Sequence, residues 1–190
     1  MSGVQSTTGR TYQRFEILMR MEPDRWIETE GGPLVCIERC FAHLWSGLNR
    51  STSGASSDYE RACAIKDYVG VLDVGPSQAL VLGDMPLSTS IWNDANGDEY
   101  IYIVRCVYTN SDEIVKKIIE DHKYLDFSDP LEIISIHFST RNIVMFDSAF
   151  TGINKEDYIT FECPFNLVHV DTKLIVVDQI ASLVVHRLRA

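Results

Sequence analysis

The sequence predicts a β-rich α+β domain, built from antiparallel strands with one clear helix. From residue 26 onward, apolar residues form short clusters separated by Gly, Pro, Asn and Asp. This rhythm is typical of strands and turns rather than of long helices. Only residues 111–124 clearly repeat apolar side chains at helical spacing. With 190 residues and 45% hydrophobic content, the chain is long enough for one domain with its own core.

The expected strands occupy most of the chain. Residues 100–108 form the clearest candidate, and residues 69–74 and 79–82 read as a hairpin, because Gly, Pro and Ser at 75–77 favour a turn. The other strand candidates are residues 33–38, 131–138, 143–146, 158–161, 167–170, 173–177 and 182–188.

Two helices are expected. Residues 111–124 place Ile and Val on one face, and Asn110 or Ser111 can cap the first turn. Acidic residues follow directly and suit the positive end of the helix dipole. A shorter second helix is expected at about residues 58–67, where apolar side chains again recur at helical spacing.

The composition of the amino-terminal residues indicates where the folded domain begins. Residues 1–11 are rich in Ser, Thr, Gly and Gln, so we expect a disordered or artificial extension, or translation from an upstream start codon. A single domain is then expected over residues 12–190. No apolar run approaches the roughly 20 residues of a membrane helix, and the amino terminus lacks the pattern of a secretion signal.

The formal net charge is -10. This negative field repels phosphate backbones, which disfavours direct nucleic-acid binding. The same field attracts basic partners and speeds their encounter. An acidic surface that serves only solubility explains the charge equally well, so charge alone indicates a partner without identifying one.

The cysteines predict neither disulfides nor a metal site. There are five of them and no CxxC pair, so we expect reduced thiols and a cytoplasmic protein. Cys36 and Cys40 lie close to His43 in the sequence, but a second pair of zinc ligands is missing. Residues 94–98 begin like a calcium-binding loop, yet Glu99 and Arg105 stand where that loop needs Gly and a bidentate Glu.

No catalytic grouping is recognisable. The chain has no G-x-S-x-G motif, and Asp147-Ser148 is typical of a turn in which side chains bond to the backbone. Arg61 and Arg105 lie among apolar residues, and a buried arginine normally needs a carboxylate. We therefore expect Asp58 and Asp84 to pair with the arginines, with no catalytic residue and no cofactor.

Six short blocks occur along the chain: residues 26–34 (WIETEGGPL), 58–63 (DYERAC), 79–86 (ALVLGDMP), 104–108 (VRCVY), 146–149 (FDSA) and 183–188 (LVVHRL). Taken together, they resemble the immunity protein 21 family. They are similar to the family's W-[VI]-E-[ST]-E-G-G-P-L, D-Y-[DE]-R-A-C, A-L-V-L-G-D-E-P, V-R-W-V-Y and F-D-S-A blocks and to its closing strand. Met85 replaces an acid of the pattern, and Cys106 replaces its tryptophan.

The resemblance implies a cytoplasmic antidote, encoded beside a toxin of a bacterial polymorphic toxin system, that binds and neutralises this toxin without catalysis. The acidic charge suits a basic toxin domain, such as a nuclease. The alternative hypothesis is a small hydrolase or ligand-binding domain whose pocket collects Asp84, Arg105, Asp147 and His186, since charged groups gathered in a cleft mark active sites.

Two sets of residues are therefore predicted. The residues expected to build the scaffold are Trp26, Gly31, Gly32, Pro33, Asp58, Tyr59, Arg61, Gly83, Asp84, Arg105 and Asp147. The acidic, loop-borne residues expected to contact the toxin are Asp94, Asp98, Glu99, Glu120, Asp121 and Asp126.

Overall fold

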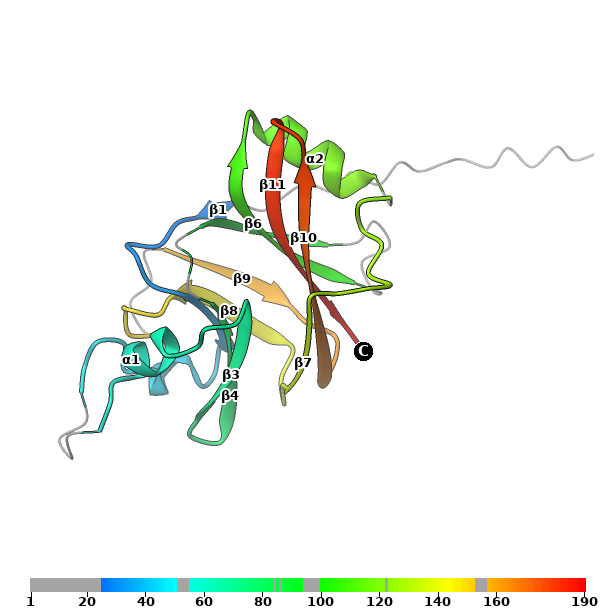
Figure 1. The fold of residues 1–190 in the computed structure, drawn as a ribbon. Helices are drawn as coiled ribbons and strands as arrows, with labels where there is room; N and C mark the ends of the chain where they lie inside the picture. Colours follow the sequence, from blue (N-terminus) through cyan, green and yellow to red (C-terminus); the bar gives the residue numbers. More distant parts are fainter. Residues whose placement is uncertain are drawn as a thin grey trace, which may run out of the picture.

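Two antiparallel sheets face each other in the computed structural model (Figure 1), which describes residues 25–50, 55–83, 85, 87–93, 100–121, 123–152 and 157–190. The six-stranded sheet consists, in spatial order, of β1 (Trp26–Ile27), β5 (Ser88–Asn93), β6 (Ile101–Thr109), β11 (Ala181–Arg189), β10 (Leu167–Val177) and β7 (Glu132–His137). The five-stranded sheet consists of β3 (Val69–Val74), β4 (Ser77–Leu82), β2 (Leu34–Glu38), β8 (Asn142–Asp147) and β9 (Tyr158–Glu162).

Strand alternation produces three apolar layers. In β2, Leu34 and Cys36 point into the core between the sheets, whereas Val35 and Ile37 point to the outer face of the five-stranded sheet. Successive strand residues face opposite sides of a sheet, so a strand that is apolar throughout requires cover on both sides. All five residues of β2 are buried.

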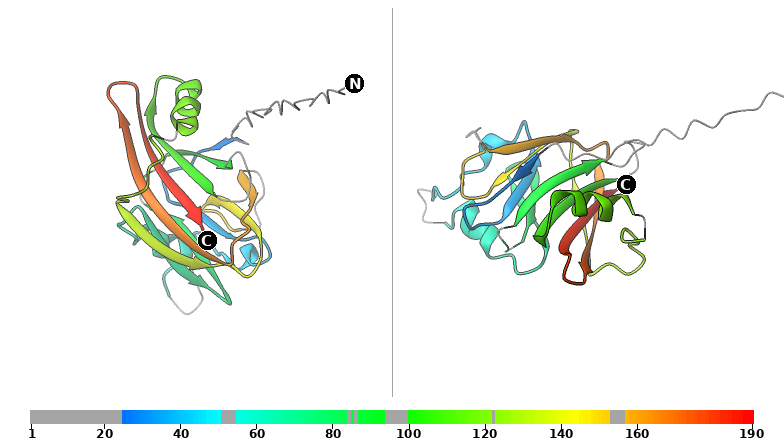
Figure 2. Two further views of the ribbon diagram at one scale, coloured as in Figure 1. Left: turned by 90° about the vertical axis from the view of Figure 1, so that its right-hand side faces the viewer. Right: turned by 90° about the horizontal axis from the view of Figure 1, so that it is seen from above.

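Helices supply the outer cover. α2 (Asp112–Glu120) packs Val115, Ile118 and Ile119 on the outer face of the six-stranded sheet (Figure 2). α1 (Asp58–Cys63) and the 3-10 helix η1 (Ala42–Leu44) cover the outer face of the five-stranded sheet. No helix among the described residues is long and apolar enough to cross a membrane.

The predicted fold class is confirmed, with local corrections. α1 begins where Ser57 and Glu60 form a reciprocal capping box, and it ends at Cys63, not at residue 67. α2 ends at Glu120, not at residue 124, because the chain then turns so that Leu125 and Phe127 join the core beneath the helix. The side chain of Ser111 makes no capping bond.

The sequence pattern did not predict two of the strands or η1, and it predicted two strands where the structure has one. Residues 167–177 form one strand, because Asp171 stays in the ladder opposite Arg187 and bonds to its guanidinium. The missed strands are β1, with only two residues, and β5, whose polar Ser88, Thr89 and Ser90 hide its strand pattern. The predicted extension at residues 1–11 lies outside the described part of the chain.

A buried carboxylate joins β2 to two neighbouring segments. Glu38 is 1% exposed and accepts hydrogen bonds from the Ser77 hydroxyl at 2.6 Å, the Ser139 hydroxyl at 2.7 Å and the Thr140 amide at 2.5 Å. Burial by itself would raise the pKa of Glu38, but these donors outweigh burial and hold the pKa below its ordinary value. The carboxylate is therefore ionised in the folded protein.

We expect Glu38→Gln to lower the free energy of unfolding by about 1–3 kcal/mol at pH 7, because an amide cannot accept all three bonds. The lowered pKa gives stability that is present above the ordinary glutamate pKa of about 4.3 and is lost as the pH falls through the lower folded value. Urea unfolding should therefore show the difference shrinking in acid. Glu162→Gln, at an exposed position on β9, is the control, and an equal loss in both variants would contradict the assignment.

Candidate functional site

The described members of the predicted toxin-contacting set lie at the end of α2 and in the segment that follows it. Glu120 ends α2 and is exposed, Asp121 follows it, and Asp126 lies in the segment that leads back to the sheet. Asp121 forms a 2.8 Å ion pair with Lys123. The other three predicted contacts, Asp94, Asp98 and Glu99, lie outside the described residues.

Asp126 belongs to a tight turn. Its carboxylate accepts the amide and the hydroxyl of Ser128, each at 3.0 Å. The pKa of Asp126 is lowered, first by these hydrogen bonds and to a smaller extent by the charges of Lys173 and Arg187. The carboxylate is thus held ionised at the surface, as electrostatic attraction of a basic partner requires.

A cluster of aromatic and charged side chains packs beside Asp126. The guanidinium of Arg187 lies 4.4 Å from the ring centre of Phe127 and 5.1 Å from that of Tyr100. It also donates two hydrogen bonds to the buried carboxylate of Asp171. Tyr100 follows residues 94–99 in the chain and Phe127 follows Asp126. Arg187 therefore brings together Tyr100 of one segment and Phe127 of the segment that contains Asp126.

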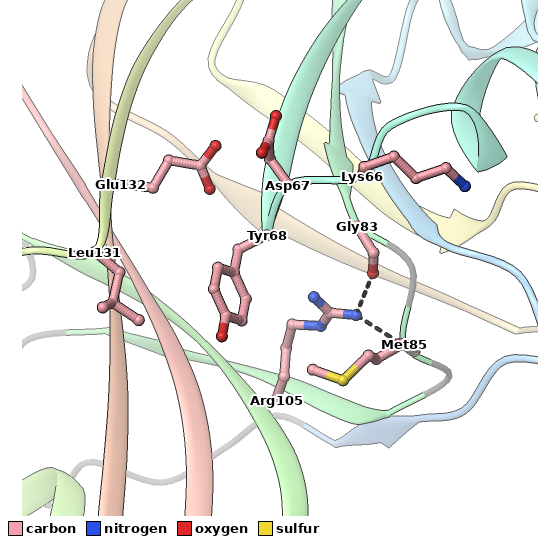
Figure 3. Close-up of a pocket in the computed structure, with 8 residues that line it drawn as sticks. All are labelled: Lys66, Asp67, Tyr68, Gly83, Met85, Arg105, Leu131 and Glu132. Carbon is pink, nitrogen blue, oxygen red and sulfur yellow. Dashed lines mark hydrogen bonds between the residues drawn. The ribbon is translucent and has the colours of Figure 1, made fainter.

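A pocket of about 460 Å³ opens between the two sheets, where the edge strands β3 and β7 approach each other (Figure 3). The amide of Val69 on β3 donates to Glu132 on β7 at 3.2 Å, and the amide of His137 on β7 donates to Gln78 on β4 at 3.1 Å. These bonds connect the sheet edges. The lining residues are Lys66, Asp67, Tyr68, Gly83, Met85, Arg105, Leu131 and Glu132.

Arg105 lies at the base of this pocket and is 1% exposed. Its Nη2 donates to the carbonyl of Gly83 at 2.8 Å and to that of Met85 at 2.6 Å, whereas its buried Nε has no hydrogen-bond partner among the described residues. Burial lowers the pKa of Arg105 to about 10. The guanidinium therefore remains charged at neutral pH and is held by backbone dipoles.

One expected carboxylate pairs with an arginine: Arg61 pairs with Asp58, with Nη1 and Oδ1 2.8 Å apart. The described partners of Arg105 are the backbone carbonyls of Gly83 and Met85. Asp84, the other expected carboxylate, lies outside the described residues, so its pairing stays a prediction. A backbone that folds around a side chain leaves no signature in residue types, so the sequence could not indicate this arrangement.

The pocket predicted by the alternative hypothesis is not assembled. Of its described members, only Arg105 lines the cavity. Asp147 instead accepts the amides of Glu30 and Ala149, each at 2.8 Å, as a turn residue does. His186 is fully buried and its Nδ1 lies 2.9 Å from the Thr172 hydroxyl.

Other scaffold positions have steric roles. A side chain at Gly83 would place its Cβ 1.9 Å from the carbonyl oxygen of Asp67, and one at Gly32 would meet the Tyr59 ring at 2.5 Å. Gly31 has φ +121°, a conformation that favours glycine. Trp26 is half-buried and packs against the cluster beneath α2, and the Pro33 carbonyl accepts the Ser148 amide at 3.0 Å.

Sequence reasoning missed Asp67, Tyr68 and Glu132, which line the pocket together with Arg105. They belong to segments about 65 residues apart in the chain that meet only because two sheet edges do. No group of three His, Cys, Asp or Glu residues suited to a metal ion occurs in the part of the chain that the structure describes. All five cysteines are free.

The fold and the sites define a β-rich, acidic domain with helices on its outer sheet faces and a small pocket of mixed charge. The family model described as Immunity protein 21 matches residues 25–174, and the chain belongs to this family. It is therefore an immunity protein, and the family implies a toxin as its partner. No curated protein and no solved structure matches the chain.

We expect Arg105→Met to lower the free energy of unfolding by about 1–3 kcal/mol, because the carbonyls of Gly83 and Met85 lose their donor in a buried site. Thermal unfolding monitored by circular dichroism measures the change. Arg141→Met removes an exposed arginine and should unfold like the wild type. An Arg105→Met protein as stable as the control would show that the two bonds do not stabilise the fold.

His186 should make stability depend on pH near neutrality. Burial, and secondly the charge of Arg105, holds the pKa of His186 well below its ordinary value, so the folded protein keeps the ring neutral. Below about pH 6.5 the unfolded chain binds a proton that the folded chain does not, so stability falls by up to about 1.4 kcal/mol per pH unit.

His186→Gln cannot titrate, and we expect it to lose this part of the slope between pH 6.5 and pH 5 in urea unfolding. His137→Gln, on an exposed position of β7, should keep the wild-type slope. Identical slopes in His186→Gln and the wild type would refute the assignment of the slope to this residue.

Proposed function

We propose that this immunity protein neutralises a toxin by forming a stoichiometric complex with it in the cytoplasm of the cell that produces both. The observation that carries the proposal is membership of the Immunity protein 21 family over residues 25–174. The protein acts through its surface, without catalysis and without a cofactor. In this role it protects its own cell during competition between bacteria that deploy polymorphic toxins.

Charge supports a basic toxin domain, and a nuclease fits this description. The net charge of -10 creates a field that accelerates the encounter with a positively charged protein. Glu120, Asp121 and Asp126 add to this field at one end of α2, where Asp126 is held ionised. Direct binding of nucleic acid by the immunity protein itself is disfavoured by the same charge.

The pocket is the one observation that favours a small-ligand or hydrolase function. Its polar side chains come from Lys66, Asp67, Tyr68, Arg105 and Glu132. A hydrolase needs a nucleophile beside a base, and the described residues that line the pocket include no Ser, Cys or His. The pocket therefore fits a binding role better than a catalytic one.

The decisive experiment is a titration of the toxin domain encoded by the adjacent reading frame. We expect its activity to fall linearly with added immunity protein and to vanish at a molar ratio of one. An enzymatic antidote would instead suppress toxin activity at far lower molar ratios, and the suppression would increase with incubation time. An active toxin in the presence of excess immunity protein would overturn the proposal.

The association rate should depend on salt and on the acidic end of α2. We expect the Glu120→Gln/Asp126→Asn double variant to associate with the toxin roughly two- to tenfold more slowly at low salt, because steering charges act mainly on the encounter. The difference should fade as salt shortens the Debye length. Stopped-flow fluorescence measures both effects.

The control for this measurement is Asp157→Asn/Glu162→Gln, which changes the net charge equally at exposed positions around β9. Equal slowing in both double variants would show that only total charge matters and that α2 has no special part.

A further inference from the structure

The six-stranded sheet extends beyond the five-stranded sheet. In Figure 1 the β10–β11 hairpin and the end of β6 rise above the strands of the other sheet, with α2 beside them. Ile175 and Leu183 on this hairpin point toward α2 and are buried beneath it. The alternate side chains therefore point to the opposite face, which the five-stranded sheet covers elsewhere but not at this end.

Three large apolar side chains lie exposed on this uncovered face. Cross-strand pairing places Val176, Ser182 and Tyr108 in one row, and Leu174 precedes Val176 by two residues on the same face. Tyr108 is 42%, Leu174 39% and Val176 58% exposed. We name these three residues the apolar ledge. Exposed apolar side chains gathered on one sheet face are typical of sites of protein–protein contact.

The ledge borders the pocket. Leu174 pairs with Val184, and Val184 pairs with Arg105, which forms the pocket base. Leu131, 57% exposed, lies at the pocket wall, and its amide bonds to the Thr172 carbonyl on the strand that carries the ledge. Ledge and pocket thus form one continuous surface, with the pocket as its recess.

The outer part of this pocket carries negative charge. Figure 3 shows the carboxylates of Asp67 and Glu132 above the Tyr68 ring and the Arg105 guanidinium beside the ring, toward Gly83 and Met85. Burial, and secondly the charge of Asp67, raises the pKa of Glu132. The two carboxylates therefore repel each other, and a cation between them would relieve this repulsion. Lys66 is directed away from them, and its ammonium donates to the Cys63 carbonyl at 3.1 Å.

We propose that the toxin docks on the apolar ledge and inserts one Lys or Arg side chain into the pocket, where Asp67 and Glu132 bind its charge. This inference rests on the proposed function and identifies the contact surface for it. The aliphatic part of the inserted side chain packs on the Tyr68 ring and Leu131, and the charged end forms hydrogen bonds to carboxylates.

Charge identifies the toxin as the occupant. A second copy of this chain would bring a further net charge of -10 to a surface that already holds two carboxylates. A basic partner gains from the same field. The inserted cation would lie beside the two carboxylates, whereas Arg105 points toward Gly83 and Met85, where its Nη2 stays bound to the carbonyls of these residues.

Two substitutions on one strand test the ledge. Val176→Glu places a charge on it, and Leu167→Glu, at a 52% exposed position at the other end of β10, is the matched control. With the purified toxin domain from the adjacent reading frame as probe, we expect Val176→Glu to weaken binding at least about tenfold, mainly through faster dissociation. Leu167→Glu should bind like the wild type.

A second pair tests the pocket. Asp67→Asn removes one pocket carboxylate, and Asp129→Asn removes an exposed carboxylate in a loop. We expect roughly tenfold weaker toxin binding for Asp67→Asn and no change for Asp129→Asn. Measuring melting temperature and sedimentation of each variant in parallel shows whether folding or self-association has changed.

The inference requires losses of affinity in both Val176→Glu and Asp67→Asn with unchanged melting temperatures. If either variant binds the toxin as tightly as the wild type does, the inference is wrong. The proposed function would still stand as long as the wild type inhibits the toxin. If Val176→Glu lowers the melting temperature but leaves the affinity unchanged, the chain's own residues occupy the ledge. If the wild type forms a dimer that Val176→Glu abolishes, a second copy of the chain occupies the ledge. Absence of toxin binding by the wild type would overturn the proposed function as well.

Discussion

The apolar contact between the inner faces of the two sheets is the interaction on which the rest of the structure depends. Leu34, Leu80 and Ile103 are among the fully buried side chains that meet there. Because this contact occupies one face of each sheet, the apolar residues of the outer faces need separate cover, which α2 and the α1–η1 region provide. Within the described part of the chain, the ledge at the end of β10 and β11 is an apolar surface without such cover.

Buried polar groups at the margins of this core need hydrogen-bond partners. Glu38 and Asp171 are each 1% exposed and keep lowered pKa values because several donors outweigh the effect of burial. Among the described residues, Arg105 binds two carbonyls and His186 one hydroxyl, and one buried nitrogen of each side chain has no partner there. On the inner face of the six-stranded sheet, these two described side chains with incomplete hydrogen bonding therefore lie beside the pocket, where a partner is proposed to bind.

The residues that identify the family serve mainly the scaffold. Gly83 admits the Asp67 carbonyl, Asp147 organises a turn and Arg61 pairs with Asp58. None of these contacts needs a toxin, so a family pattern can persist while the surface that meets the toxin changes. Of the proposed contacts, Leu174, Val176, Asp67 and Glu132 lie outside the quoted sequence blocks, whereas Tyr108 ends the block of residues 104–108. Most positions proposed for specificity therefore differ from those that encode the fold.

The sequence by itself determined the β-rich class, most strands, the position of α2 and the family, because alternation, helical spacing and turn residues are local properties. It also offered Asp58 as a carboxylate for one of two arginines, and the structure pairs it with Arg61, three residues away on one helix. Only the tertiary structure decided that Arg105 binds carbonyls, that β10 is unbroken at Asp171, and that a pocket and an apolar ledge exist. Each of these depends on which strands become neighbours, and strand order is set by burial summed over the whole chain, which no local pattern contains.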